Sequence, residues 1–374
     1  MKVALVHDYL TQDGGAERVL RVLQELFPDA PTFVLFHHPS TPNLLMREKD
    51  IRTTFLQYLP FIKRHYQWYL PLMPFATERH NIQNFDVVIS STSAFAKGII
   101  TSPSTLHISY CHTPTRYLWT DTHSYIQELN YPWAVKAMLP SIISRLRLWD
   151  QMSAQRVDHF IANSEVVKER IQKFYRRDAR VIYPPIDLNT YSLAPHPEDY
   201  FLAGGRLVSY KRFDLVVEAF NRLGLPLKIF GSGTEETTLK ARALPNIEFL
   251  GRVDDDALKN LYRNAIAFIN PQVEDFGLTA IESMASGRPV IAYAEGGALE
   301  TIKEHINGIF FHEQSWEAIA DAVLHFDHTR FMPEEVRASV EKFDIAQFKK
   351  QLQDSVEALT EDYKKGVRQT HFNL

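Results

Sequence analysis

The sequence predicts an α/β fold made of two open, doubly wound parallel sheets. Short runs rich in Val, Ile, Leu and Phe alternate with patterns of helical spacing, which is typical of parallel strands joined by covering helices. The alternation restarts near residue 199, after a proline-containing stretch. A chain of 374 residues is long enough for two domains of ~100–200 residues each. We therefore expect one sheet in each half.

Strands are expected where runs of β-branched and other apolar residues are bounded by turn residues. In the first half these runs are KVALVHDYL, DVVIS, LHISYCH, HFIAN and RVIYP. In the second half they are YFLAGG, LKIFGSG, IEFLG, AIAFINP, PVIAYAEGG and GIFFH. Prolines between 184 and 197 oppose regular structure, because they fix φ and lack a donor, so we place the interdomain linker there.

The expected domains are residues 1–184 and residues 185–345. Residues 346–374 form a C-terminal segment that we expect to pack back on the first domain as a helix. Its apolar stripe has three- and four-residue spacing and consists of Phe348, Leu352, Val356 and Leu359.

The bulk composition excludes several classes of protein. A formal net charge of −4 argues against a nucleic-acid binder that relies on bulk phosphate attraction. Cys111 is the only cysteine and the first residues run directly into an expected strand, so a cytoplasmic protein without disulfides or a signal peptide is predicted. No uninterrupted apolar run reaches the ~18 residues that a membrane span needs.

The first strand ends in a loop that contains Gly14 and Gly15, just before the helical pattern ERVLRVLQELF. Adjacent glycines at a helix N-terminus allow backbone amides to approach an anion such as a phosphate. The alternative is a tight turn without a ligand. The spacing is not GxGxxG, so a nicotinamide-dependent dehydrogenase is not indicated.

Two cations follow the first strand of the second half. Arg206 and Lys211 lie between YFLAGG and the helical pattern DLVVEAFNRL, at the expected carboxyl edge of the sheet. Fixed cations there can neutralise a diphosphate leaving group. The alternative is a pair of solvated surface charges.

The most informative segment runs from Pro271 to Val290. A helix is expected to begin near Leu278 and to end at Gly287, which places Glu274 in the preceding loop and Glu282 on the helix. Carboxylates can accept hydrogen bonds from sugar and ribose hydroxyls, while the amides at the helix start face phosphates. The alternative is a helix cap and a surface acid.

The stretch EDFGLTAIESMASGRPVIA closely resembles the E-x7-E signature of retaining glycosyltransferases of the GT-B fold, in the group called family 4. The GG pair, the R-x4-K pair and the linker prolines occur in the expected order, so the resemblance covers essentially the whole chain. YCHTPTRYLW, and Trp149-Asp150 with SAQRVDHFIANS, look most like bacterial polysaccharide mannosyltransferases that use GDP-mannose. The resemblance implies two Rossmann-like domains that face each other across a cleft, with residues 1–184 binding the acceptor and residues 185–345 binding the nucleotide-sugar donor.

The resemblance also implies roles for individual residues. Arg206 and Lys211 would hold the donor diphosphate, Glu274 would contact the transferred sugar, and Glu282 would bind the ribose. His112 would touch the sugar near the reacting centre, although without the family a structural histidine is the simpler interpretation. Backbone contacts to sugar and phosphate would come from Phe276, Gly277, Leu278 and Thr279.

Gly14 and Gly15 would approach the donor from the first domain. Gly231, Arg252 and Val253 are candidate walls for the nucleotide base, although loop packing explains them nearly as well. The implied reaction retains the anomeric configuration without a covalent intermediate. It transfers a hexose, mannose from GDP-mannose in our interpretation, to a glycan or lipid-linked acceptor.

Two alternatives remain open for the function. One is a retaining transferase that uses a UDP-sugar, and the other is a non-catalytic protein that binds nucleotide sugars. No cofactor or metal is expected, because the acid run Asp254-Asp255-Asp256 is better interpreted as the cap of the helix ALKNLYRNA.

Residues 55–75 combine aromatic residues with Lys63, Arg64 and His65. They could form a peripheral contact with the inner face of a membrane, beside a lipid-linked acceptor. The alternative, which we favour at this point, is a buried helix pair broken at Pro71 and Pro74.

Overall fold

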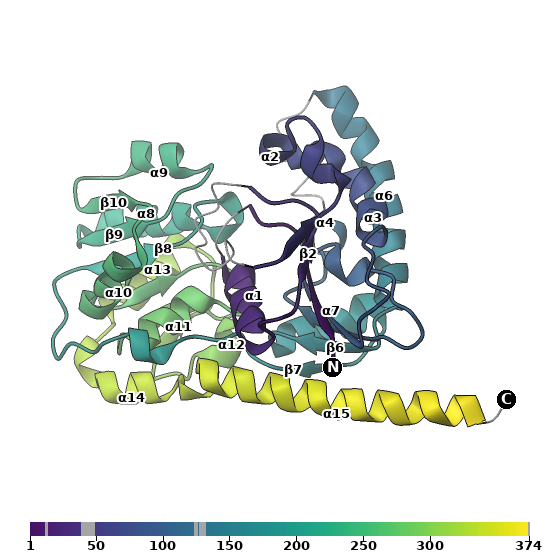
Figure 1. Ribbon diagram of the computed structural model, residues 1–374. Helices are drawn as coiled ribbons and strands as arrows, with labels where there is room; N and C mark the ends of the chain where they lie inside the picture. The colour runs from purple at the N-terminus through teal and green to yellow at the C-terminus, as the bar shows by residue number, and fades with distance from the viewer. Residues whose placement is uncertain (12–13, 39–48, 123–125, 127–131, 373–374) are drawn as a thin grey trace. The chain divides into compact units, whose positions relative to one another are not determined.

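The computed structural model describes residues 1–11, 14–38, 49–122, 126 and 132–372 (Figure 1). The chain forms two compact units. The first unit contains Met1–Pro185 together with Phe348–Leu374, and the second contains Ile186–Gln347. The first unit is therefore assembled from both ends of the chain.

The first unit contains a seven-stranded parallel sheet of order β3-β2-β1-β4-β5-β6-β7. Every strand expected from the sequence of this half is present. The strands Thr32–Val34 and Ile51–Thr53, on one side of β1, were not expected. The strands are β1 (Val3–His7), β2 (Thr32–Val34), β3 (Ile51–Thr53), β4 (Val87–Thr92), β5 (Leu106–Cys111), β6 (His159–Ala162) and β7 (Ala179–Val181).

Helices cover this sheet, and their apolar faces supply most of its core. The α-helices are α1 (Gly15–Leu26), α2 (Ile62–His65), α3 (Met73–Glu78), α4 (Arg116–Trp119), α6 (Trp133–Ala154), α7 (Glu165–Tyr175) and α15 (Ile345–Phe372). The 3-10 helices of this unit are η2 (Phe55–Tyr58), η3 (Tyr66–Leu72) and η4 (Ala96–Gly98).

The second unit contains a six-stranded parallel sheet of order β10-β9-β8-β11-β12-β13. All six expected strands are present, as β8 (Phe201–Gly204), β9 (Leu227–Phe230), β10 (Ile247–Gly251), β11 (Phe268–Asn270), β12 (Val290–Tyr293) and β13 (Gly308–Phe311). The helices are α8 (Phe213–Leu223), α9 (Glu236–Arg242), α10 (Asp255–Asn264), α11 (Leu278–Ala285), α12 (Ala298–Thr301), α13 (Trp316–Leu324) and α14 (Pro333–Ala338), with 3-10 helices η5 (Leu188–Thr190), η6 (Ser209–Lys211), η7 (His328–Arg330) and η8 (Glu341–Phe343).

Two predictions about helices are confirmed. Asp254 caps α10, because its side chain accepts a hydrogen bond from the Ala257 amide. The C-terminal helix α15 buries the expected residues Phe348, Leu352 and Val356 in the first unit. Burying such side chains is worth ~1.5–3 kcal/mol each.

The favoured interpretation of residues 55–75 is wrong. They form the short helices η2, α2 and η3 and the start of α3, and several of their aromatic side chains are exposed rather than buried. Tyr58 is 84% exposed, Phe61 66% and Trp68 55%. Only one side of the segment, with Leu56 and Ile62, packs into the core. None of the described helices is long and apolar enough to cross a membrane.

Candidate active site

The loops that follow β8 and β9 pack backbone against backbone, and against the end of β10, in the second unit. A Cβ added at Gly231 would lie 1.8 Å from the carbonyl oxygen of Gly205, and one at Gly233 would lie 2.0 Å from that of Leu207. The Gly231 amide also donates to the Gly251 carbonyl at 2.6 Å. Because only glycine permits this approach, the sequence GSG fixes the carboxyl edge of the sheet. Arg252 is exposed beyond Gly251, and Val253 is half-buried.

Lys211 and Glu274 form an ion pair at this edge. The Nζ atom of Lys211 lies 2.7 Å from Oε1 of Glu274, and the two side chains are 11% and 21% exposed. Lys211 ends the 3-10 helix η6, directly after the loop that leaves β8. Arg206 is exposed and donates to the Tyr210 hydroxyl at 3.0 Å. The structure thus brings Lys211 together with Glu274, two residues that are 63 apart in the chain.

The loop that carries Glu274 is held by the glycines that follow β12. The Gly297 amide donates to the Glu274 carbonyl at 2.8 Å, and a Cβ at Gly297 would lie 2.6 Å from the Cα of Phe276. Gly277 has a φ of 90°, which suits glycine, and it caps the start of α11. The half-buried Leu278 and Thr279 begin that helix. Its free amides therefore lie next to the acidic loop, as the sequence predicts.

Glu282 is more deeply placed than Glu274. Its side chain is buried, and its carboxylate accepts a hydrogen bond from the Tyr262 hydroxyl at 2.9 Å. Nearby in the chain, Oδ1 of Asn270 and Oε1 of Gln272 are buried without a hydrogen-bond partner among the described residues. The sequence analysis singled out none of Tyr262, Asn270 and Gln272, because nothing in a single sequence marks them as neighbours of this loop.

In the first unit, Gly14 precedes α1 and Gly15 begins it. The Gly14 amide donates to Oε2 of Glu17 at 2.9 Å, and Glu17 is itself buried. Residues 12–13 of the same loop lie outside the described residues. The Gly-Gly loop is therefore tied to a buried carboxylate through its own helix.

His112 lies immediately after β5, and a series of side-chain contacts joins it to Glu17 at the start of α1. Its Nε2 is 2.8 Å from Oγ of Ser91, and the same oxygen is 3.1 Å from Nδ1 of His7. Nε2 of His7 lies 3.9 Å from Oε1 of Glu17. Three strand ends and the start of α1 thus meet at one polar cluster, formed by His7, Glu17, Ser91 and His112. The sequence analysis found only His112.

Burial makes His112 a neutral group. The side chain is 9% exposed, and desolvation, with a smaller contribution from His7, lowers the pKa of His112 to about 3. A neutral imidazole can accept one hydrogen bond and donate another, but it supplies no positive charge. His112 is therefore suited to contact a sugar hydroxyl and is not a cationic partner of a phosphate.

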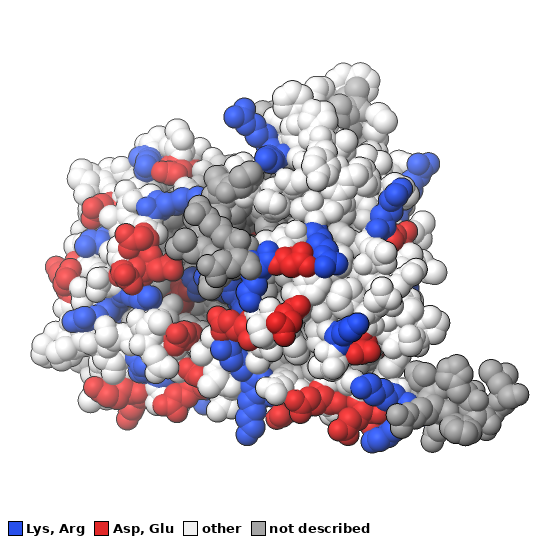
Figure 2. Space-filling view, viewed as in Figure 1, with Lys and Arg blue, Asp and Glu red and all other residues white. Residues whose placement is uncertain are grey.

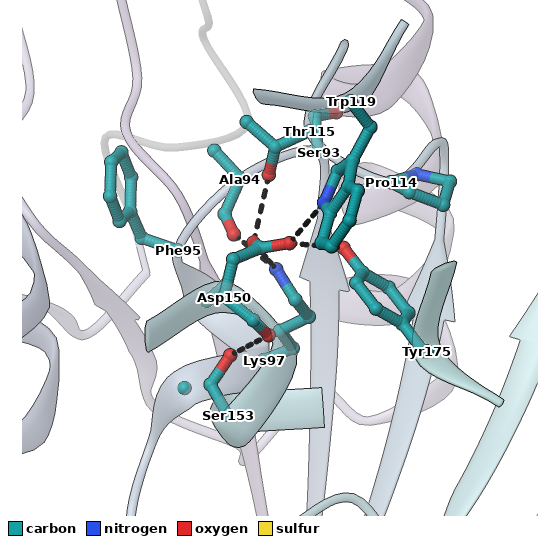
Figure 3. A network of polar contacts seen from close by, with 12 residues as sticks. Ser93, Ala94, Phe95, Lys97, Pro114, Thr115, Trp119, Asp150, Ser153 and Tyr175 are labelled. Carbon is teal, nitrogen blue, oxygen red and sulfur yellow. Dashed lines mark hydrogen bonds and ion pairs between the residues drawn. The ribbon is translucent and has the colours of Figure 1, made fainter. Parts of the chain in front are cut away.

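The segment after His112 is anchored by the buried carboxylate of Asp150 (Figure 3). The Asp150 carboxylate accepts hydrogen bonds from Nζ of Lys97 at 2.5 Å and from the Thr115 hydroxyl at 3.0 Å. It also accepts them from Nε1 of Trp119 and from the Tyr175 hydroxyl, at 2.8 Å each. Both charged side chains are 1% exposed. The network connects α6 to the loop and to α4, and so fixes the chain that leaves β5.

No group of three or more His, Cys, Asp or Glu side chains within the described ranges is arranged to hold a metal ion. The expectation that the reaction needs no metal stays a prediction.

Two family models match the chain. The model described as "Glycosyltransferase Family 4" matches residues 13–190, and the one described as "Glycosyl transferases group 1" matches residues 191–343. The matched ranges meet within the proline-containing stretch between the two sheets.

Relatives and solved structures agree with these matches. The chain is 25% identical over 300 residues to the α-1,3/1,6-mannosyltransferase of Saccharomyces cerevisiae, covering 65% of this chain and 56% of that protein. It is 28% identical over 153 residues to the O-antigen chain mannosyltransferase RfbU of Salmonella typhimurium, covering 38% and 43%. This chain covers less than half of the length of other matched relatives, 34% and 49% in two cases.

The structure of HepE from Anabaena, in complex with UDP and glucose, superposes with a TM-score of 0.70. The alignment covers 96% of this chain and 99% of HepE, at 17% sequence identity. At this identity the likeness concerns the fold alone. It agrees with the two parallel sheets described above.

Proposed function

Because this chain belongs to the group 1 glycosyltransferases and has the GT-B fold, we propose that it transfers a hexose from a nucleoside-diphosphate donor to a glycan acceptor, with retention of configuration. The observation that carries this proposal is the half-buried pair of Lys211 and Glu274 at the carboxyl edge of the second sheet. Ligands bind at this edge in open α/β sheets.

In the proposed reaction the cation serves the leaving group. The bond between the anomeric carbon and the diphosphate oxygen breaks, and Lys211 and Arg206 stabilise the negative charge that develops there. Once Lys211 is engaged by the diphosphate, the carboxylate of Glu274 is free to accept hydrogen bonds from hydroxyls of the transferred hexose. The buried Glu282 would bind the ribose, oriented by Tyr262.

Retention follows if the acceptor hydroxyl attacks from the face that the diphosphate leaves. The new bond joins the acceptor oxygen to the anomeric carbon, and the acceptor proton passes to an oxygen of the departing phosphate. No protein nucleophile and no metal are required, because the two cations balance the charge. His112 would hold a sugar hydroxyl as a neutral partner, and the amides of Gly14 and Gly15 would approach the donor.

The proposed donor is GDP-mannose, and the proposed acceptor is a lipid-linked glycan of a cell-surface polysaccharide, reached from the cytoplasmic side. Support comes from the mannosyltransferases of Salmonella typhimurium and Saccharomyces cerevisiae among the relatives. The complex of HepE with UDP and glucose keeps UDP-sugars as the second candidate donors. A non-catalytic nucleotide-sugar-binding protein is the candidate of another class.

A donor panel tests the proposal. The melting temperature is measured with GDP-mannose and UDP-glucose, and release of the nucleoside diphosphate is then measured with and without EDTA. A donor at ~100 times its dissociation constant stabilises the fold by ~2.7 kcal/mol. GDP-mannose is expected to raise the melting temperature most and to be turned over in EDTA. Stabilisation without turnover would favour the non-catalytic alternative, and no stabilisation by any nucleotide sugar would refute the proposal.

A further inference from the structure

The exposed aromatic residues of this protein are concentrated in one segment. Of the six exposed aromatic side chains among the described residues, all but Trp133 lie between residues 55 and 75. They are Phe55, Tyr58, Phe61, Trp68 and Phe75, and with Leu72 they form what we call the aromatic segment. Exposed apolar surface of this kind is costly in water and marks an interaction site.

The rings gather in pairs on the surface of the first unit. Phe61 lies 6.4 Å from Trp68 between ring centroids, and His65 stacks on Trp68 at 4.5 Å. Phe55 and Phe75 form a second pair at 5.9 Å. The opposite side of the segment packs into the core shared with α6, so the segment is anchored from beneath.

The backbone also holds one ring outward at a cost. Phe61 has φ 58° and ψ 4°, in the left-handed region that bulky residues avoid, and yet its side chain is 66% exposed. Strain that directs an apolar ring into water does not serve the stability of the fold. Such a conformation points to a contact outside the chain.

The charge of this surface has one sign. Between residues 51 and 77 the sequence contains no Asp or Glu, while Lys63 and Arg64 are exposed on α2 beside the rings. In the view of Figure 2, the surface over α2 is accordingly blue and white. Trp and Tyr rings prefer the headgroup level of a bilayer, and neighbouring cations are attracted to anionic lipids.

From this combination we propose that the aromatic segment, with Lys63 and Arg64, docks the protein on a bilayer that carries anionic lipids. The rings enter the interface, and the cations lie against the lipid phosphates. The inference does not depend on the proposed sugar transfer, because the surface lies outside the residues assigned to the donor. It would bring a lipid-linked acceptor to the first unit.

Vesicle sedimentation without any nucleotide sugar tests the docking. The full chain is mixed with phosphatidylcholine vesicles, with or without roughly one-third phosphatidylglycerol, at low and high salt. We expect binding to the anionic vesicles that weakens with salt. Each cation near the surface contributes about fivefold to binding, so Lys63→Glu with Arg64→Glu should reduce it by at least ~25-fold.

Matched variants separate docking from general effects of charge. Lys350→Glu with Lys364→Glu makes the same change of charge on exposed positions of α15 in the same unit, and should leave vesicle binding within about twofold. Tyr58→Ser with Trp68→Ser should abolish binding at high salt, whereas Leu299→Ser with Leu324→Ser, which are exposed in the second unit, should not.

The proposal is overturned if the unmodified chain stays in the supernatant with anionic vesicles, or if both charge-reversed pairs bind equally. It is also overturned if the aromatic segment instead drives a concentration-dependent dimer that Tyr58→Ser with Trp68→Ser dissociates. Melting temperature verifies that each variant is folded. Donor hydrolysis in free solution should be unchanged in all of them, so a failure of docking and a failure of sugar transfer are distinguishable.

Discussion

Each unit contains a lysine–carboxylate pair, and the two pairs differ in burial and in use. Lys97 and Asp150 in the first unit are 1% exposed each, and the carboxylate receives three further hydrogen bonds. Lys211 and Glu274 in the second unit are 11% and 21% exposed. A sealed pair with every partner in place serves the fold, whereas a partly buried pair, which we call the open pair, can exchange its partner for a ligand.

The largest expected effect comes from breaking the sealed pair. Asp150→Ala leaves the Lys97 ammonium buried without its counter-charge, and should lower the free energy of unfolding by ~3–5 kcal/mol in urea denaturation. The double variant Asp150→Ala with Lys97→Met should recover part of this loss, because no buried charge remains. A loss below ~1 kcal/mol in the single variant would mean that the pair does not support the fold.

Breaking the open pair should mainly reduce turnover rather than stability. Lys211→Ala is expected to reduce turnover of the donor by ~100- to 1,000-fold, as removal of a preorganised group from a leaving-group site does. Its free energy of unfolding should fall by less than that of Asp150→Ala, because the pair is less deeply buried. The control is Lys240→Ala, which removes the exposed pair with Glu236 and should leave turnover intact. Near-normal turnover in Lys211→Ala would refute its proposed role.

A smaller effect, on how stability depends on pH, should come from the buried side chain of His112. The pKa of His112 is about 3 in the fold, against 6.5 as its ordinary value. Between these values the unfolded chain binds a proton that the native chain does not, so stability is full above pH 6.5 and falls as the pH decreases. One such group contributes up to ~1.4 kcal/mol per pH unit.

His112→Gln should reduce the slope of the unfolding free energy with pH between pH 6 and pH 4. The reduction corresponds to about one proton taken up on unfolding. Burial also lowers the pKa of His107 to about 3, so His107 contributes a similar slope in the unmodified chain and in the variant. His325→Gln, at a side chain that is 77% exposed, is the matched control. Equal slopes in His112→Gln and the unmodified chain would contradict a neutral, buried His112.

The sequence allowed both sheets to be predicted, because parallel strands buried on two faces are continuous apolar runs. The bounds of α11 and the Asp254 cap were predictable too, since a glycine, a proline and an acid mark helix ends locally. The strands Thr32–Val34 and Ile51–Thr53 were not predicted. Ile51–Thr53 contains a single apolar residue, which is too few to form a strand pattern.

What the sequence could not supply is contact between distant residues. His7 and Ser91 are 84 positions apart, and they meet only because β1 and β4 are neighbours in the sheet. Residues 55–75 were misjudged for a related reason. Apolar content predicts burial on average, but which side of a short helix faces water depends on what packs beneath it. The roles assigned to the donor-site residues, and the cleft between the sheets, stay predictions.

The return of the chain to the first unit has a consequence for biosynthesis. Phe348, Leu352 and Val356 are buried there, and the Phe348 ring lies 5.8 Å from that of Tyr110. On the ribosome, Ile186–Gln347 is complete before these residues emerge, although Met1–Pro185 is translated first. The first unit is thus translated first but completes its hydrophobic core last. A nascent chain that stalls before α15 would leave apolar residues of the first unit exposed to chaperones.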